Sequence, residues 1–345
     1  MKLAKKSLLG SGETRHGRTV AVLVLLAFLA AMADLMLGRG FSVPRFIPAL
    51  SDSSSVEGQI LRLVRLPRVA TAALSGAGLG VAGLILQAVL RNPLASPELT
   101  GVNPAAVLGV IVAISFSLVR LDSAMGLLSA ALIGGLLGGA ISYLLTNRLG
   151  SHQLILVGVL TAAVTGGVTV LFLSLNSSQF GNVLRWLVGS VDGRTWENLR
   201  YAAPWILAWI LVVALFSGVL PIIAGGDSHA AGLGVALLAA RGLLLFAAVA
   251  LIAGSAALAG AISFIGLGVP HIVRALVGGQ SRWAVPAAAL VGSILLCACD
   301  ALAQFGTGII AASDISQRAG LPAGAVAALI GAGALVWAAR KLDKQ

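Results

Sequence analysis

Long apolar stretches alternate with short polar turns along nearly the whole chain. A helix that crosses a bilayer needs about 20 apolar residues, and ten segments approach or reach that length. Their approximate limits are 19–37, 68–90, 100–119, 124–146, 153–175, 201–221, 241–260, 263–277, 284–305 and 321–339. We therefore predict an all-α, polytopic membrane protein with about ten transmembrane helices in a single domain, residues 1–345.

Small residues recur four positions apart inside several of these segments. Such pairs let membrane helices approach closely, and they are Gly76/Gly80, Gly134/Gly138 and Gly135/Gly139. No strand precedes the glycine-rich strings, so they do not indicate a nucleotide site. The eighth segment is short, and we interpret Pro270 and His271 as a structural break within it, since a proline removes a helix hydrogen bond.

The composition supports a membrane protein and excludes a soluble one. Hydrophobic residues make up 58% of the chain and charged residues 10%, and the mean hydropathy is +1.00. So little polar surface could not cover a soluble core. The formal net charge is +11. Its cations lie mostly in turns and tails, which favours lipid headgroups and protein partners over nucleic acid.

The sequence lacks the residue patterns that ATP binding, metal binding or catalysis would need. All five lysines lie near the two ends of the chain, so the body contains no Walker A motif and cannot bind ATP through one. The four histidines lack the spacing of metal ligands. Cys297 and Cys299 lie in an apolar run, where we expect two buried thiols. We therefore predict no catalytic site, metal or bound cofactor in this chain.

The distribution of basic residues predicts the orientation. Cytoplasmic loops and tails are enriched in lysine and arginine, so residues 1–18 form a predicted cytoplasmic tail and ten spans return the C-terminus to the same side. Five arginines then fall in the first external loop: Arg39, Arg45, Arg62, Arg65 and Arg68. Either an acidic partner protein or snorkelling to lipid phosphates would account for this cluster.

Four motifs together resemble one family. They are RLPR at 65–68 with RNPLASPE at 91–98, AGAISFIGLGVPHIVRALVGG at 259–279, WLVGS at 186–190 with a following Trp196, and Gly226-Asp227 ahead of Leu233-Gly234. In this order they are similar to the permease subunits of ABC importers for iron-siderophores, haem and cobalamin. The resemblance covers about residues 60 to 340.

The resemblance implies a type II ABC importer permease architecture with ten spans and both termini in the cytoplasm. It implies a second permease subunit, two ATPase subunits that use ATP and Mg²⁺, and a substrate-binding protein. Arg65 and Arg68 match the arginines that face the binding protein, with Arg62 one turn away. The loop 225–241 matches the segment that couples to the ATPase. Its matching residues are Gly226, Asp227, Ala230, Leu233 and Gly234. Ser151 and His152 match the inner gate.

Three positions depart from the family pattern. Gln304 replaces a second docking arginine, Gly320 replaces a glutamate before the last span, and Gly333 replaces a proline within it. These changes are compatible with one member of a heteromeric permease pair.

We expect a permease for ferric-siderophore complexes in the cytoplasmic membrane of a bacterium, with haem or cobalamin as alternative substrates. An ion-coupled secondary transporter would need an ionisable residue within the membrane, and Asp300 is the one candidate for it. An intramembrane enzyme would need paired catalytic groups, which the sequence does not show.

Overall fold

The computed structural model is a bundle of helices. It describes residues 2–37, 51–120, 123–149, 154–175, 187–233, 236–278, 281–311 and 320–342, and no strand occurs within these ranges. The helices are α1 (Lys2–Met36), α3 (Val56–Ile60), the π-helical turn η2 (Leu61–Arg65), α4 (Leu66–Val89), α5 (Val102–Ser115), α6 (Ala124–Leu149), α7 (Leu154–Leu175), α9 (Trp196–Leu215), α10 (Val219–Ala224), α11 (Asp227–Gly232), α12 (Leu237–Ala259), α13 (Ile265–Val277), α14 (Ala284–Ala311) and α15 (Ala323–Leu342).

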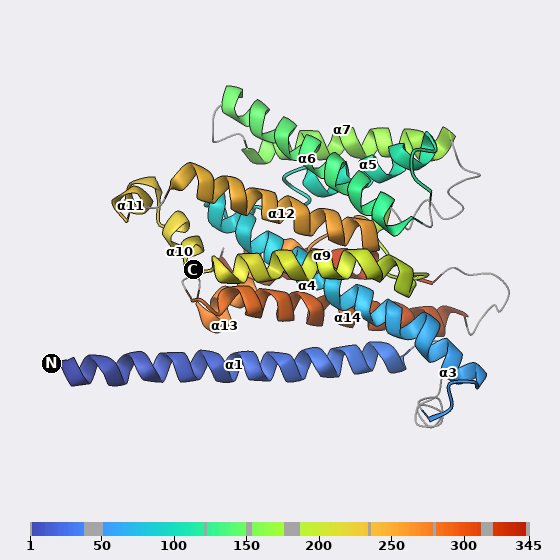
Figure 1. Ribbon diagram of the computed structural model, residues 1–345, viewed down its shortest axis with the longest axis horizontal. Coiled ribbons are helices and arrows are strands. Elements are labelled where there is room, and N and C mark those ends of the chain that lie inside the picture. The colour runs from blue at the N-terminus through green and yellow to red at the C-terminus, as the bar shows by residue number, and fades with distance from the viewer. Residues whose placement is uncertain are drawn as a thin grey trace.

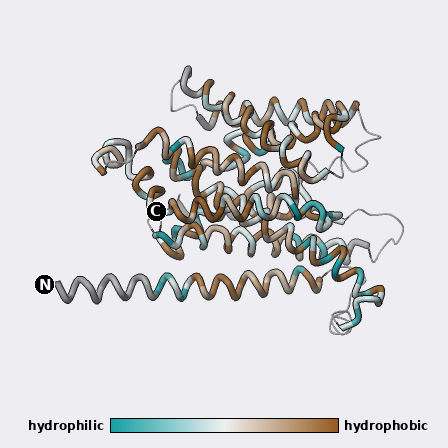
Figure 2. Tube along the Cα trace, in the orientation of Figure 1, coloured by the Kyte–Doolittle hydropathy of each residue, from teal (hydrophilic) through white to brown (hydrophobic). Residues whose placement is uncertain are grey.

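Each of the ten predicted apolar segments corresponds to a described helix. Seven are long and apolar enough to cross a membrane, and three apolar helices are shorter: Val102–Ser115, Ile265–Val277 and Ala323–Gly333. The helices are apolar along most of their length, and hydrophilic residues gather toward their ends (Figure 2). The first helix begins earlier than predicted, because residues 2–18 are helical and continue into α1.

Helices α4 and α12 form the centre of the bundle. The apolar stretch that contains α4 is 83% buried and that of α12 is 78% buried, whereas the apolar part of α1 is only 17% buried. Helix α4 runs diagonally through the middle, with α14 and α12 beside it (Figure 1). The side chains of Val22, Leu25 and Phe28 on α1 are exposed, as expected for a helix that faces lipid.

Backbones touch where glycines face one another. A Cβ added to Gly76 on α4 would overlap the carbonyl of Gly292 on α14, and one added to Gly292 would overlap the carbonyl of Gly76. Gly134 on α6 meets Gly109 on α5 in the same way. The predicted small-residue packing is therefore confirmed at these crossings.

The predicted break at Pro270 is wrong. Helix α13 continues from Ile265 to Val277 with Pro270 inside it, and the ring nitrogen Nδ1 of His271 lies 2.9 Å from the carbonyl oxygen of Leu267. The interruption lies before α13, at residues 260–264, where Gly260 and Phe264 both have φ of +72°. A proline in the second turn of a helix costs one hydrogen bond, which a short helix in a packed bundle tolerates.

Candidate functional site

The π-helical turn η2 contains Arg62 and Arg65, and it leaves one backbone carbonyl without a helical partner. The N–H of Leu66 donates to the carbonyl of Leu61, five residues back, and Pro67 has no N–H for the next carbonyl in the series, that of Arg62. The indole Nε1–H of Trp196 donates to this Arg62 carbonyl at 2.7 Å. The first residue of α9 is thereby attached to the turn that carries the arginines.

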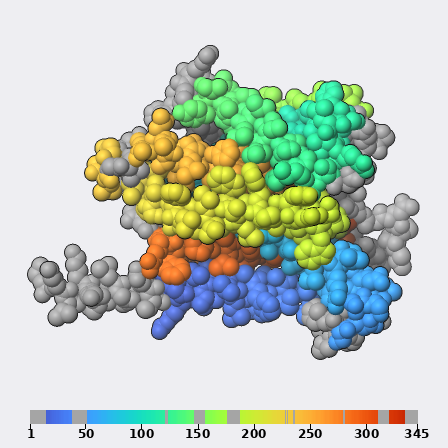
Figure 3. Space-filling model, in the orientation of Figure 1, coloured from blue at the N-terminus to red at the C-terminus, as the bar shows by residue number. Residues whose placement is uncertain are grey.

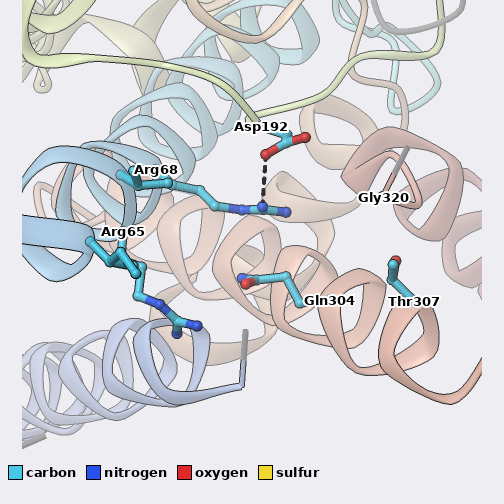
Figure 4. A pocket seen from close by; sticks show the side chains of 8 residues that line it. Arg65, Arg68, Asp192, Gln304, Thr307 and Gly320 are labelled. Carbon is cyan, nitrogen blue, oxygen red and sulfur yellow. Dashed lines mark hydrogen bonds and ion pairs between the residues drawn. The ribbon is translucent and has the colours of Figure 1, made fainter. Parts of the chain in front are cut away.

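Arg68 forms an ion pair with two carboxylates from distant parts of the chain. Its Nε and Nη2 donate to the two oxygens of Asp300 on α14 at 2.6 and 2.9 Å, and its Nη1 donates to Asp192 at 3.0 Å. The side chain of Asp300 is 1% exposed, whereas that of Asp192 is 28% exposed. Figure 4 shows the Arg68 side chain extended from α4 toward Asp192. Bidentate pairing fixes the geometry as well as the charge balance.

Gln304 extends this network to a third carboxyl group. Its Nε2 donates to Asp34 Oδ1 at 2.6 Å and lies 3.0 Å from Asp300 Oδ2. Asp34 is near the end of α1 and is 1% exposed. An amide at position 304 can therefore bridge two buried carboxyl groups and connect α1 to α14.

The three predicted docking arginines differ in their surroundings. Arg65 is 6% exposed, and its Nη1 donates to the carbonyl of Leu35 on α1 at 2.5 Å. Figure 4 shows its side chain directed toward α1, away from that of Arg68. The side chain of Arg62 is exposed. A role for these arginines in docking stays a prediction, and for Arg65 and Arg68 it has to coexist with the internal contacts.

A polar pocket of about 250 Å³ lies beside this network, lined by Ile60, Val64, Arg65, Arg68, Asp192, Gln304, Thr307 and Gly320. Most small-molecule sites are larger and more apolar than this. Among the described residues no cluster of His, Cys, Asp and Glu could hold a metal ion. The chemistry that this arrangement supports is charge pairing between helices and loops.

Sequence reasoning identified Arg68 but not its partners. Asp34 and Asp192 belong to no motif in the sequence, and Gln304 was noted for the arginine that it replaces. An ionisable residue inside an apolar segment is by default a functional candidate. That signal applies to Asp34, which directly follows an apolar run.

The predicted coupling segment, residues 225–241, contains the short helix α11 and directly follows the short helix α10, at the end of the bundle opposite α3. Gly226 has φ of +112° and separates α10 from α11, which projects from the body of the bundle (Figure 1). Ala230 is fully buried, whereas Leu233 is 58% exposed. Figure 3 shows this projection as a yellow-orange lobe. Gly234 and the predicted inner gate, Ser151 and His152, lie outside the described residues, as does the side chain of Asp227.

The turn between α4 and α5 contains a partly buried acid, Glu98. Burial raises the pKa of Glu98 from 4.5 to about 6, although hydrogen bonds from Ser96 and from the Phe264 backbone oppose the shift. Because the folded-state pKa is raised, this group stabilises the fold fully below pH 4.5, and the contribution is lost as the pH rises through 6.

Glu98→Gln is therefore expected to raise the thermal stability of the purified protein at pH 7.5. A shift of this size corresponds to roughly 2 kcal/mol in the free energy of unfolding, and the gain should disappear below pH 5. Thermal unfolding at pH 5.0, 6.0 and 7.5 measures the effect. A lower stability of the variant at pH 7.5 would contradict it.

The apolar helices and the polar groups gathered near their ends define a multi-pass membrane protein. Residues 21–341 match the FecCD transport family, and the chain belongs to this family. It is a permease of the metal-chelate type of ABC importer.

Several known proteins are similar to this chain over most of its length. The Fe(3+)-citrate import system permease protein YfmE of Bacillus subtilis (strain 168) is 34% identical over 91% of this chain and 92% of its own length. The vitamin B12 import system permease protein BtuC of Vibrio cholerae is 32% identical over 96% of both chains. A solved inward-facing structure of a metal-chelate type ABC transporter has a TM-score of 0.77 and 28% identity, covering 93% of this chain and 99% of that one.

Proposed function

We propose that this chain is the membrane subunit of an ATP-driven importer of ferric-siderophore complexes in a bacterial cytoplasmic membrane. The observation that carries the proposal is the match, over nine-tenths of the chain, to a permease for ferric citrate, an Fe³⁺ chelate. The vitamin B12 permease of similar identity makes cobalamin the principal alternative substrate, and haem remains a third.

The two ends of the bundle support different partners. At the α11 end, Leu233 and Leu238 are 58% and 84% exposed, which suits a contact with a separate ATPase subunit. At the α3 end, Arg62 is exposed, and its charge suits docking of an acidic binding protein, since complementary charges steer association and fix its register. This assignment places the α11 end in the cytoplasm. A second permease subunit, identical or not, would complete the pathway.

Uptake measurements test the substrate. Cells that lack this permease, and cells that have regained it, are given radiolabelled ferric-siderophores, haem and cobalamin in parallel. We expect ferric-siderophore uptake to be lost in cells that lack the permease and to return when the permease is restored, because the complex then has a route across the membrane. Unchanged ferric-siderophore uptake with loss of haem or cobalamin uptake would contradict the substrate proposal. Uptake into vesicles without any ATPase would favour an ion-coupled transporter instead.

A further inference from the structure

We infer that the turn between α4 and α5, residues 91–101, together with Phe264, transmits movement of the coupling segment to helices α7 and α15. Phe264 is a positioning residue in this inference: its ring sets the position of α15. The inference rests on the proposed function, because it describes how that transport would be driven. Its support lies in four sets of contacts, all between described residues.

The first contact joins the turn to the predicted coupling segment. Arg91 begins the turn with a left-handed backbone, φ of +49°. Its Nη1 lies 3.8 Å from the position that a Cβ would take on Gly226, the glycine between α10 and α11. A non-glycine residue held with positive φ is uncommon, and such residues concentrate at functional sites. A shift of α11 would therefore act directly on the start of the turn.

The turn itself is a compact unit closed by its own hydrogen bonds. The N–H of Thr100 donates to the carbonyl of Ser96 at 3.0 Å, and the N–H of Asn103 donates to that of Pro97 at 3.1 Å. The Thr100 hydroxyl donates to the Ser96 carbonyl at 3.0 Å. A segment with so many internal bonds moves as one body.

The middle of the turn contacts residues 262–266, where the chain enters α13. The backbone of Phe264 lies close enough to the carboxyl group of Glu98 to lower its pKa, and the side chain of Asn103, just after the turn, donates to the carbonyl of Ile262 at 3.4 Å. Pro97 lies so close to Gly266 that a Cβ there would overlap the proline ring. Residues 262–266 are thus attached to the start of α5 by one hydrogen bond and packed against the turn through Pro97 and Gly266.

The remaining contacts reach α7 and α15. A Cβ on Gly158 of α7 would overlap the carbonyl of Leu99, and the carbonyl of Thr100 accepts a hydrogen bond from Ser142 of α6 at 3.0 Å. The ring of Phe264 lies against Gly331 of α15, where any Cβ would overlap it. Neither glycine has a side chain that could yield at these contacts, so a movement of the turn displaces both helices.

The contacts form a chain from α11 to α15 that contains two strained residues, Arg91 and Phe264. Packed interfaces respond to small shifts by switching between arrangements and do not deform continuously. The left-handed backbone at Phe264 (φ of +72°) directs its ring to α15 while its N–H faces Glu98. One residue thereby joins the turn to α15.

Phe264→Ala tests this inference in the complete complex of permease, ATPase and binding protein reconstituted in liposomes. We measure ATP hydrolysis and the amount of ferric-siderophore imported per ATP. The variant should hydrolyse ATP at nearly the wild-type rate but import about tenfold less substrate per ATP, within the range of effects for mutations along coupled networks. Phe264→Leu, which keeps an apolar side chain against Gly331, should recover part of the loss.

Phe246→Ala is the matched control. Phe246 on α12 packs its ring against Trp209, 5.3 Å between centroids, and has no part in this set of contacts. Its substrate-to-ATP ratio should stay at the wild-type value. An unchanged ratio in Phe264→Ala, or an equal loss in both variants, would overturn the inference. Failure of the wild-type complex to import any ferric-siderophore would refute the proposed function and, with it, this inference.

Discussion

Replacing Arg68 with alanine is expected to destabilise the protein more than any other single change of charge. The substitution leaves the carboxylate of Asp300, which is 1% exposed, without its bidentate partner at 2.6 and 2.9 Å. Breaking a buried ion pair from one side costs about 3–5 kcal/mol, since an uncompensated charge remains. The purified protein in detergent should unfold roughly 10 °C lower in a thermal scan.

Two further variants separate this effect from docking. Arg62→Ala removes an exposed side chain and keeps the carbonyl that Trp196 uses, so it should change the free energy of unfolding by no more than about 0.5 kcal/mol. Adding Asp300→Asn to Arg68→Ala should recover much of the lost stability, because the buried charge is gone. An Arg68→Ala protein as stable as wild type would show that the pair does not form.

The second large effect is expected at the crossing of α4 and α14. In Gly76→Val, the new side chain would occupy the space of the Gly292 carbonyl and also lie near Leu296. Overpacking a core costs about 1–3 kcal/mol when side chains can adjust, and here a backbone must move, so the loss should exceed that range. We expect little monodisperse protein in size-exclusion chromatography after extraction.

Gly242→Val on α12 is the comparison for this experiment. Gly242 is exposed, and a Cβ there meets no atom within 4 Å, so this variant should be recovered like the wild type. Gly76→Ala should fall between the two. Normal recovery of Gly76→Val would mean that α4 and α14 do not touch at this point.

The hydrophobic pattern predicted much of the fold, because apolar length and small-residue spacing are local properties. All ten segments correspond to helices, and Gly76 and Gly134 lie at close helix crossings, as predicted. The start of α1 was missed, since polar residues 2–18 carry no apolar signal although they continue the same helix. Pro270 was misread because a proline in the sequence does not show whether neighbouring helices support the backbone around it.

The site was predictable only in part. RLPR drew attention to Arg68, but Asp300 is 232 positions away in the sequence, and no local pattern connects the two. Asp192 is 124 positions from Arg68, which is also beyond the reach of any local pattern. The role of Gln304 depends on the position of Asp34 on another helix, so the substitution of an amide for an arginine could be noted but not explained.

Pro67 has a consequence beyond the shape of the helix. In the π-helical register, an N–H at position 67 would point at the Arg62 carbonyl, the oxygen that receives the Trp196 indole at 2.7 Å. Any other amino acid at position 67 would bring a rival donor to that oxygen. The proline and the tryptophan are far apart in the sequence, yet the missing N–H of the first leaves the Arg62 carbonyl to the indole of the second.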